Sequence, residues 1–183
     1  MLTFAVYVQD HPGVLNRVAS LFRRRALNIE SLTVGHTERP GVSRMTIVVD
    51  APETARGRIA ANLYKLLEVE RIESIPLASA VHRDLALIKV AASQVSRSEV
   101  MQLVHVFRAR VVDVAPESLV VEITGTEDKI DGLLDVLRPY GVLEMVRTGR
   151  VAMTRGGASD AGVGAGDSPA GAETLQEGVS YSV

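Results

Sequence analysis

The chain has 183 residues and a formal net charge of −2, which is long enough for one or two domains and gives no general attraction to nucleic acid or anionic membranes. It contains no cysteine, so disulfide bonds, thiolate nucleophiles and cysteine zinc sites are excluded. No apolar run approaches the roughly 18 residues of a membrane-spanning helix. We therefore expect a cytoplasmic protein with neither nucleic acid nor membrane as a partner.

The first half of the chain shows the element pattern β-α-β-β-α-β. Alternating apolar and polar residues predict strands, and apolar residues three and four apart predict helices. The sequence DAPE at residues 50–53 has the form of a capping box, and Pro76 indicates a bend or a sheet edge. The expected strands span residues 2–9, 29–37, 42–49 and 72–81, and the expected helices span residues 13–26 and the segment that DAPE begins.

The same order of elements repeats in the second half. A second capping box, SRSE at residues 96–99, and the sequence GTED at residues 125–128 each begin a helix. The expected strands span residues 85–92, 111–114, 119–123 and 142–153. This repeat predicts an α+β protein with two ferredoxin-like βαββαβ domains, at residues 1–82 and 83–155. The glycine- and alanine-rich residues 156–183 are expected to be a flexible, disordered tail.

Several predicted strands are apolar on both faces, although two helices can cover only one face of each sheet. The segments LALIKV at 85–90 and LVVEI at 119–123 are examples. The second face of each sheet therefore needs another cover, for which a dimer or a partner protein is the simplest source. On the strand at 42–49, Arg44 is expected to bridge to an acidic residue across the sheet or on a partner subunit.

The turn after the first strand has the features of a binding site for a free aliphatic amino acid. The backbone amides of Gly13, Val14 and Leu15 lie at a helix start, where N–H groups are unpaired and favour a carboxylate. Asp10 can accept a hydrogen bond from an ammonium group, and Asn28 offers both a donor and an acceptor. Val14 and Leu15 add apolar surface. The alternative interpretation is an ordinary Pro-Gly turn with a left-handed Asn cap.

Other kinds of site have no support in the sequence. No serine lies in a nucleophile elbow, and no glycine-rich phosphate loop follows a strand, so we expect no catalytic residue in this chain. The four histidines lack the spacing of metal ligands, so we expect no metal site.

Two long segments resemble the family of small regulatory subunits of acetolactate synthase. They are HPGVLNRVASLFRRRALNIESL at residues 11–32 and NIESLTVGHTERPGVSRMTIVV at residues 28–49. The resemblance implies that the first domain is an ACT domain, which dimerises side by side and binds an amino-acid effector between the subunits. The effector positions that it implies are Asp10, Gly13, Val14, Leu15, Asn28 and Ile29.

The resemblance also implies a role in branched-chain amino-acid biosynthesis. A homodimer would associate with the catalytic (large) subunit of acetolactate synthase, raise its activity, and make it sensitive to feedback by valine, isoleucine or leucine. Thiamine diphosphate, magnesium and FAD are expected in the catalytic subunit, with no cofactor and no catalytic residue in this chain. The alternative is a stand-alone amino-acid-sensing ACT module with a different partner.

Overall fold

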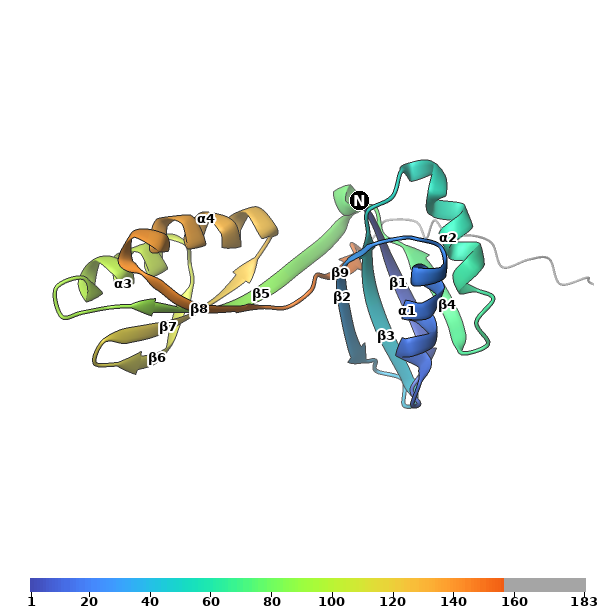
Figure 1. Cartoon of the computed structure of the whole chain (residues 1–183), viewed down its shortest axis with the longest axis horizontal. Coiled ribbons are helices and arrows are strands. Elements are labelled where there is room, and N and C mark those ends of the chain that lie inside the picture. The colour runs from blue at the N-terminus through green and yellow to red at the C-terminus, as the bar shows by residue number, and fades with distance from the viewer. Residues whose placement is uncertain (157–183) are drawn as a thin grey trace, which may run out of the picture.

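The computed structural model describes residues 1–156, which form two α+β domains arranged end to end (Figure 1). Each domain has an antiparallel sheet with its two longer helices on one face, as the ferredoxin-like pattern predicts. Apart from Gly156, the predicted tail lies outside the described residues.

The N-terminal domain follows the predicted order β-α-β-β-α-β. Its sheet has four strands in the order β2-β3-β1-β4, so β2 and β4 are the edge strands. The elements are β1 (Leu2–Gln9), α1 (Val14–Arg24), β2 (Ile29–His36), β3 (Val42–Val49), the 3-10 turn η1 (Glu53–Ala55), α2 (Arg56–Leu63) and β4 (Val69–Ser74).

The core of this domain lies between the sheet and the two helices. In the register of β1 and β3, Phe4 pairs with Ile47, and both side chains are fully buried. Phe22 from α1 and Leu63 from α2 belong to the same apolar cluster. Full burial of such a side chain contributes about 1.5–3 kcal/mol, so this cluster holds α1 in place against the sheet.

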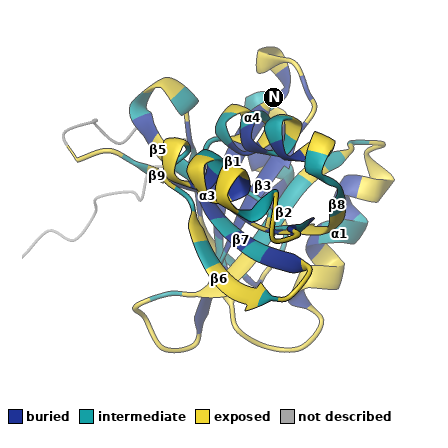
Figure 2. Ribbon diagram, turned by 90° about the vertical axis from the view of Figure 1, so that its left-hand side faces the viewer, coloured by how far each residue is buried: buried dark blue, intermediate teal, exposed yellow. Residues whose placement is uncertain are grey.

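The C-terminal domain repeats this arrangement around a longer central strand. Its sheet has the order β6-β7-β5-β8, and β9 pairs with β5 outside that path. The elements are η2 (Leu77–Ser79), β5 (Ala80–Ala91), α3 (Arg97–Val106), β6 (Arg110–Ala115), β7 (Ser118–Gly125), α4 (Glu127–Leu137), η3 (Arg138–Tyr140), β8 (Val142–Arg147) and β9 (Val151–Thr154). Viewed from the end of this domain, the edge strand β6 is largely exposed (Figure 2).

The strand β5 joins the two domains. Its first residues, from Ala80 to Arg83, pair with β9, and its remaining residues pair with β7. The predicted strand 72–81 is therefore wrong, because β4 ends at Ser74 and Ala80 already belongs to β5. Pro76 explains the break, since it has no N–H for a ladder and begins η2 instead. The predicted domain division at 82/83 falls inside this continuous strand.

The predicted single strand 142–153 is also wrong, because it divides into β8 and β9. Between them, Gly149 lies against the backbone of β2. An added Cβ at Gly149 would be 2.8 Å from the carbonyl oxygen of Leu32 and 2.6 Å from Thr33 Oγ1. The chain therefore leaves the C-terminal sheet after Arg147, crosses β2, and pairs again with the start of β5.

The second face of the N-terminal sheet is covered by this same chain. Ala80 and Ala152, from β5 and β9, form a buried cluster with Ala5 and Ile75. Arg44 donates a hydrogen bond through Nη2 to the carbonyl oxygen of Ala152. The prediction that a dimer or a partner must cover this face is therefore wrong for the N-terminal sheet, because the β5–β9 ribbon supplies the cover. An alternating strand pattern shows that a face is buried but not what buries it.

The C-terminal sheet keeps its outer face open. Leu87 on β5 pairs with Val146 on β8, and their exposed fractions are 37% and 59%. In the same sheet, Lys89 pairs with Glu144, so charged groups lie beside the apolar ones. For this face, the expectation from the sequence that a dimer or a partner protein covers it stays a prediction.

The two predicted capping boxes differ from the observed helix starts. For α3, the box lies one turn earlier: the N–H of Ser93 donates to Ser96 Oγ at 3.1 Å, and the N–H of Ser96 donates to Ser93 Oγ at 3.3 Å. Ser96 has no side-chain capping bond toward α3, so it completes this box rather than beginning another. In the segment DAPE, Pro52 precedes η1 without a side-chain cap, because a 3-10 turn occupies the place of the first helical turn.

Candidate functional site

The turn between β1 and α1 is open to a ligand at Gly13. Gly13 adopts a left-handed conformation, with φ 92° and ψ −14°, and precedes α1 without a side-chain capping bond. An added Cβ there would meet no atom within 4 Å. The first N–H groups of an α-helix lack partners within the helix and carry its positive end, so this turn can receive a carboxylate.

Asp10 connects this turn to the far end of β2. Its Oδ2 lies 3.1 Å from His36 Nδ1, and its N–H donates to the carbonyl oxygen of Gly41 at 2.8 Å. The Asp10 side chain is 42% exposed, so its carboxylate can accept a hydrogen bond from an ammonium group in solution. Donors suited to a carboxylate and an acceptor suited to an ammonium group thus lie in one turn.

The two predicted apolar residues have different surroundings. Val14 is only 4% exposed and packs in the core, whereas Leu15 is 45% exposed. Ile29 is half-buried, pairs with Val49, and packs against the same core. Of the predicted apolar wall, Leu15 is therefore the side chain with the most surface available to a ligand or a second subunit.

Asn28 lies at the other end of α1. The helix has 11 residues and rises about 1.5 Å per residue, so about 16 Å separates its two ends. Asn28 is exposed, and its Nδ2 donates to Glu30 Oε1. One chain therefore brings Asp10, Gly13 and Leu15 together but does not bring Asn28 to them.

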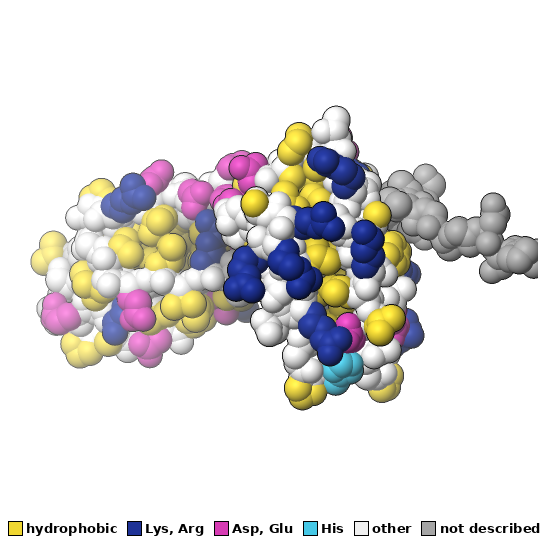
Figure 3. Space-filling model, turned by 45° about the vertical axis from the view of Figure 1, so that its right-hand side comes forward, with side chains coloured by type: hydrophobic (Ala, Val, Ile, Leu, Met, Phe, Trp, Pro, Cys, Tyr) yellow, Lys and Arg dark blue, Asp and Glu magenta, His cyan; other side chains and the backbone are white. Residues whose placement is uncertain are grey.

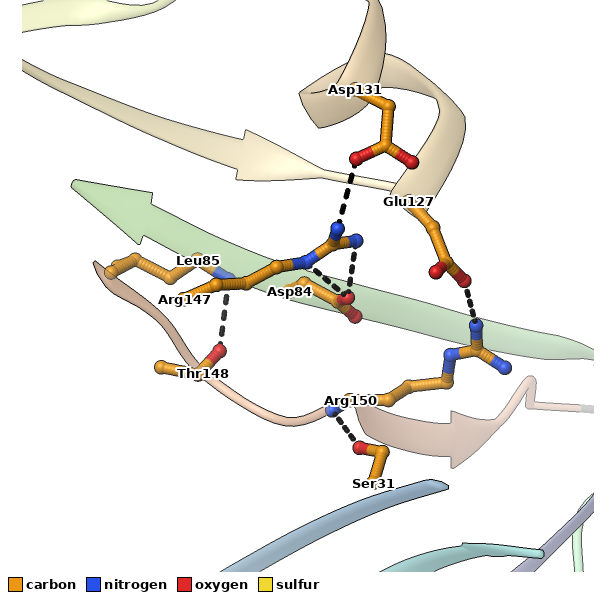
Figure 4. A network of polar contacts seen from close by, with 8 residues as sticks. All are labelled: Ser31, Asp84, Leu85, Glu127, Asp131, Arg147, Thr148 and Arg150. Carbon is orange, nitrogen blue, oxygen red and sulfur yellow. Dashed lines mark hydrogen bonds and ion pairs between the residues drawn. The ribbon is translucent and has the colours of Figure 1, made fainter. Parts of the chain in front are cut away.

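Sequence reasoning missed a contact that joins this domain to the next. The N–H of Arg150 donates to Ser31 Oγ at 2.8 Å, and its Nη2 lies 3.1 Å from Glu127 Oε2 at the start of α4 (Figure 4). Ser31 is three residues from Asn28, so the strand β2 that follows Asn28 touches the C-terminal domain. The only signal in the sequence is the polar break TGR within an otherwise strand-like segment.

A second pair of contacts in Figure 4 joins the end of β8 to the interior of β5 and to α4. Arg147 Nη2 donates to Asp84 Oδ2 at 2.8 Å, and its Nη1 donates to Asp131 Oδ1 at 3.0 Å. Burial is the largest single influence on Arg147 and lowers the pKa of its guanidinium. The hydrogen bond to Asp84 and the nearby acidic charges together outweigh burial, so the pKa is raised. The side chain of Asp84 is 8% exposed, so removal of Arg147 would leave the carboxylate of Asp84 buried without that ion pair.

Arg44 has different partners from those predicted. Its Nη1 donates to Thr46 Oγ1 at 2.9 Å, and its Nε donates to Tyr7 Oη at 3.3 Å. Together with the carbonyl oxygen of Ala152, these acceptors are neutral and come from this chain. Arg44 therefore contributes to the contact between the N-terminal sheet and β9.

Comparisons with known proteins match both domains. Residues 4–71 match the family model described as the AHAS small subunit-like ACT domain, and residues 83–156 match the one described as the small subunit of acetolactate synthase. The chain belongs to the acetolactate synthase small-subunit family. The resemblance found in the sequence is therefore confirmed, and the site around Gly13 lies inside the matched ACT domain.

Relatives of this small subunit are similar over both domains. The probable acetolactate synthase small subunit of Archaeoglobus fulgidus is 50% identical over 154 residues, which is 84% of this chain and 96% of that protein. The small subunit of Mycobacterium leprae is 52% identical over 84% of this chain and 91% of its own. The crystal structure of the Thermotoga maritima small subunit has a TM-score of 0.80 and 40% identity, covering 84% of this chain and 96% of that one.

Proposed function

We propose that this small subunit regulates acetolactate synthase: it binds the catalytic subunit, raises its activity, and confers feedback inhibition by valine, isoleucine or leucine. The observation that carries this proposal is the open, left-handed Gly13 turn beside Asp10, within the matched ACT domain. The effector carboxylate would bind the N–H groups at the start of α1, and its ammonium group would bind Asp10.

A side-by-side dimer would complete this site. Because β2 is an edge strand, it can pair with β2 of a second copy across a two-fold axis. If the axis passes near Leu32 and Thr33, Asn28 of the second copy faces the C-terminal end of β2 in the first copy. At that end of the first copy, His36 contacts Asp10. Two copies would thus join the Gly13 turn of one chain to Asn28 and Ile29 of the other.

Two further features belong to the same proposal. Thiamine diphosphate, magnesium and FAD would be held by the catalytic subunit, and this chain would supply no catalytic residue and no cofactor. The location would be cytoplasmic. Among residues 1–156, none of the helices is long and apolar enough to cross a membrane.

The effector signal has a short route to the C-terminal domain. Binding at β2 would act on Ser31, which holds Arg150, and Arg150 holds Glu127 on α4. A coupling of about 1–3 kcal/mol between effector and catalytic subunit would change either affinity about 5–150-fold. Linkage requires the catalytic subunit to change effector affinity by the same factor.

Reconstitution with the catalytic subunit tests this function. Acetolactate formation is measured with and without the small subunit and with increasing valine, and the assay is repeated with Gly13→Asp and Gly13→Asn. Asp and Asn tolerate a left-handed backbone better than most residues, and an added Cβ at position 13 meets no atom within 4 Å. The two variants therefore differ mainly in charge. We expect activation by both variants and a much larger loss of valine sensitivity with Gly13→Asp, because its carboxylate repels that of the effector.

The possible outcomes separate the role from the site. If the wild-type chain does not stimulate the catalytic subunit, the regulatory role is wrong. If it stimulates and Gly13→Asp keeps full valine inhibition, the role stands and the Gly13 site is wrong. Co-purification of the tagged chain without a large thiamine-diphosphate enzyme would favour the stand-alone sensor.

A further inference from the structure

A pocket between α1 and α2 lies at the opposite end of α1 from the Gly13 turn of the same chain, and none of its lining residues is one of the proposed effector positions. Its volume is about 260 Å³. The residues that line it come from the end of α1, from η1 and from α2: Arg25, Leu27, Ala55, Arg58, Ile59 and Asn62. Since Gly13 and Arg25 flank opposite ends of α1, the pocket and the effector turn are about one helix length apart.

The floor of this pocket is apolar and its rim is basic. Ala55 and Ile59 are buried, and Leu27 packs against the core. Arg25 and Arg58 are both exposed at the rim. Figure 3 shows the N-terminal domain with Lys and Arg groups gathered around apolar side chains. A ligand of this pocket must therefore combine negative charge with an apolar body.

Neither of the two rim arginines has an acidic partner among residues 1–156. Arg25 Nη2 donates to the neutral Asn62 Oδ1 at 3.0 Å, and Arg58 has no hydrogen bond or ion pair to any of residues 1–156. By contrast, four other arginines of the domain pair with glutamates, as Arg17–Glu68, Arg39–Glu70, Arg56–Glu53 and Arg71–Glu73.

The position of Arg58 is unfavourable for the helix that carries it. A cation is stabilised at the C-terminal end of a helix, which accounts for Arg23 and Arg24 in the last turn of α1. Arg58 is the third residue of α2, where the helix dipole disfavours positive charge. Folding of this chain therefore gives no electrostatic reason for an arginine at this position, whereas an external anion would.

We propose that the α1–α2 pocket is a docking site for an acidic, partly apolar segment of the catalytic subunit. This inference rests on the proposed function, because it takes the catalytic subunit as the occupant. Charge complementarity supports it: Arg25 and Arg58 offer guanidinium groups for carboxylates, and Leu27 and Ile59 offer apolar surface for a neighbouring side chain. Contacts of this kind raise the rate of association and set the choice of partner.

Binding of the purified catalytic subunit to the full-length chain tests this docking site. The variants are Arg58→Glu and Arg25→Glu, with Arg58→Lys as the conservative substitution. Arg138→Glu serves as the control, because Arg138 is exposed in the C-terminal domain and its ion pair is with the exposed Asp135. Arg58→Glu puts an anion in the first turn of α2, which the dipole favours, so we expect the chain to fold.

We expect both Arg-to-Glu variants in the pocket to raise the dissociation constant for the catalytic subunit at least tenfold. Arg58→Lys should keep most of the affinity, and Arg138→Glu should stay within twofold of wild type. The affinity of wild type should fall more steeply with salt than that of Arg58→Glu. Valine binding by the free chain should be unchanged in all four variants, because none of the substituted residues is one of the proposed effector positions.

Each other outcome has a distinct meaning. If wild type binds and the pocket variants bind equally well, the docking site is wrong and the regulatory function stands. If wild type itself does not bind, the proposed function fails. If Arg58→Glu changes the mass of the free chain in sedimentation, the occupant is a second copy. Loss of valine binding by Arg58→Glu would place the pocket in the effector site; either of these last two results overturns the proposal.

Discussion

The backbone N–H of Arg150 donates to Ser31 Oγ across 2.8 Å, although the two residues are 119 positions apart in the sequence. This hydrogen bond joins β2, the edge strand of the N-terminal sheet, to the segment between β8 and β9. It therefore links the strand that follows Asn28 to the C-terminal domain.

The substitution Ser31→Ala should weaken this connection. It leaves the Arg150 N–H without its acceptor, and we expect a loss of about 1 kcal/mol in the free energy of unfolding, measured in urea. Thr33→Val is the matched control, because Thr33 Oγ1 is buried and has no hydrogen bond to any of residues 1–156, so its removal should cost nothing. In the reconstituted enzyme, we expect Ser31→Ala to activate normally and to require more valine for half inhibition. Equal stability of Ser31→Ala and wild type would contradict this.

Gly149→Ala should disturb the same contact by crowding it. The new Cβ would lie 2.8 Å from the backbone oxygen of Leu32, which cannot rotate away, so the segment must shift from β2. Overpacking of this kind costs about 1–3 kcal/mol, to be measured as a lower unfolding midpoint. Gly35→Ala, on β2 itself, has open space around the added methyl group and should leave the midpoint nearly unchanged. A tolerated Gly149→Ala would show that the close approach is not needed.

Asp84→Asn should destabilise the C-terminal domain. Asp84 is nearly buried, and its loss of charge leaves the guanidinium of Arg147 with Asp131 as its remaining acidic partner. We expect a cost of about 3 kcal/mol, measured by denaturant unfolding. The exposed pair of Arg138 and Asp135 gives the control, since Asp135→Asn should cost less than about 1 kcal/mol. Similar costs for the two variants would mean that burial of Asp84 has no effect.

Ser93→Ala should remove the observed cap of α3. The Ser93 hydroxyl accepts from the N–H of Ser96 and closes a reciprocal pair, so its loss should cost about 1 kcal/mol of stability. Ser98→Ala lies on the exposed side of the same helix and should be neutral or slightly stabilising, because Ala has the higher helix propensity. Helix content and unfolding midpoint by circular dichroism measure both. If only Ser98→Ala lowered the midpoint, the cap would be wrongly placed.

Local patterns predicted the elements whose surroundings are uniform along their length. The strands at 2–9 and 42–49 match β1 and β3 at both ends, because each lies in the middle of a sheet and alternates without interruption. The strand predicted at 142–153 failed because the segment changes sheets at Gly149. Apolar and polar residues alternate in the same way in both sheets, so the alternation cannot show where the chain moves from one sheet to the other.

The candidate site divides in the same way. By itself, the sequence determined that Gly13 begins a helix at an open turn and that Asn28 begins a strand, because glycine and asparagine are suited to left-handed and turn backbone. The predicted helix between them also places these two residues at opposite ends of α1. Only the folded chain shows that the β5–β9 ribbon covers the first sheet and that Arg150 meets Ser31. Turn chemistry acts over a few neighbouring residues, whereas these contacts depend on the path of the whole chain through both domains.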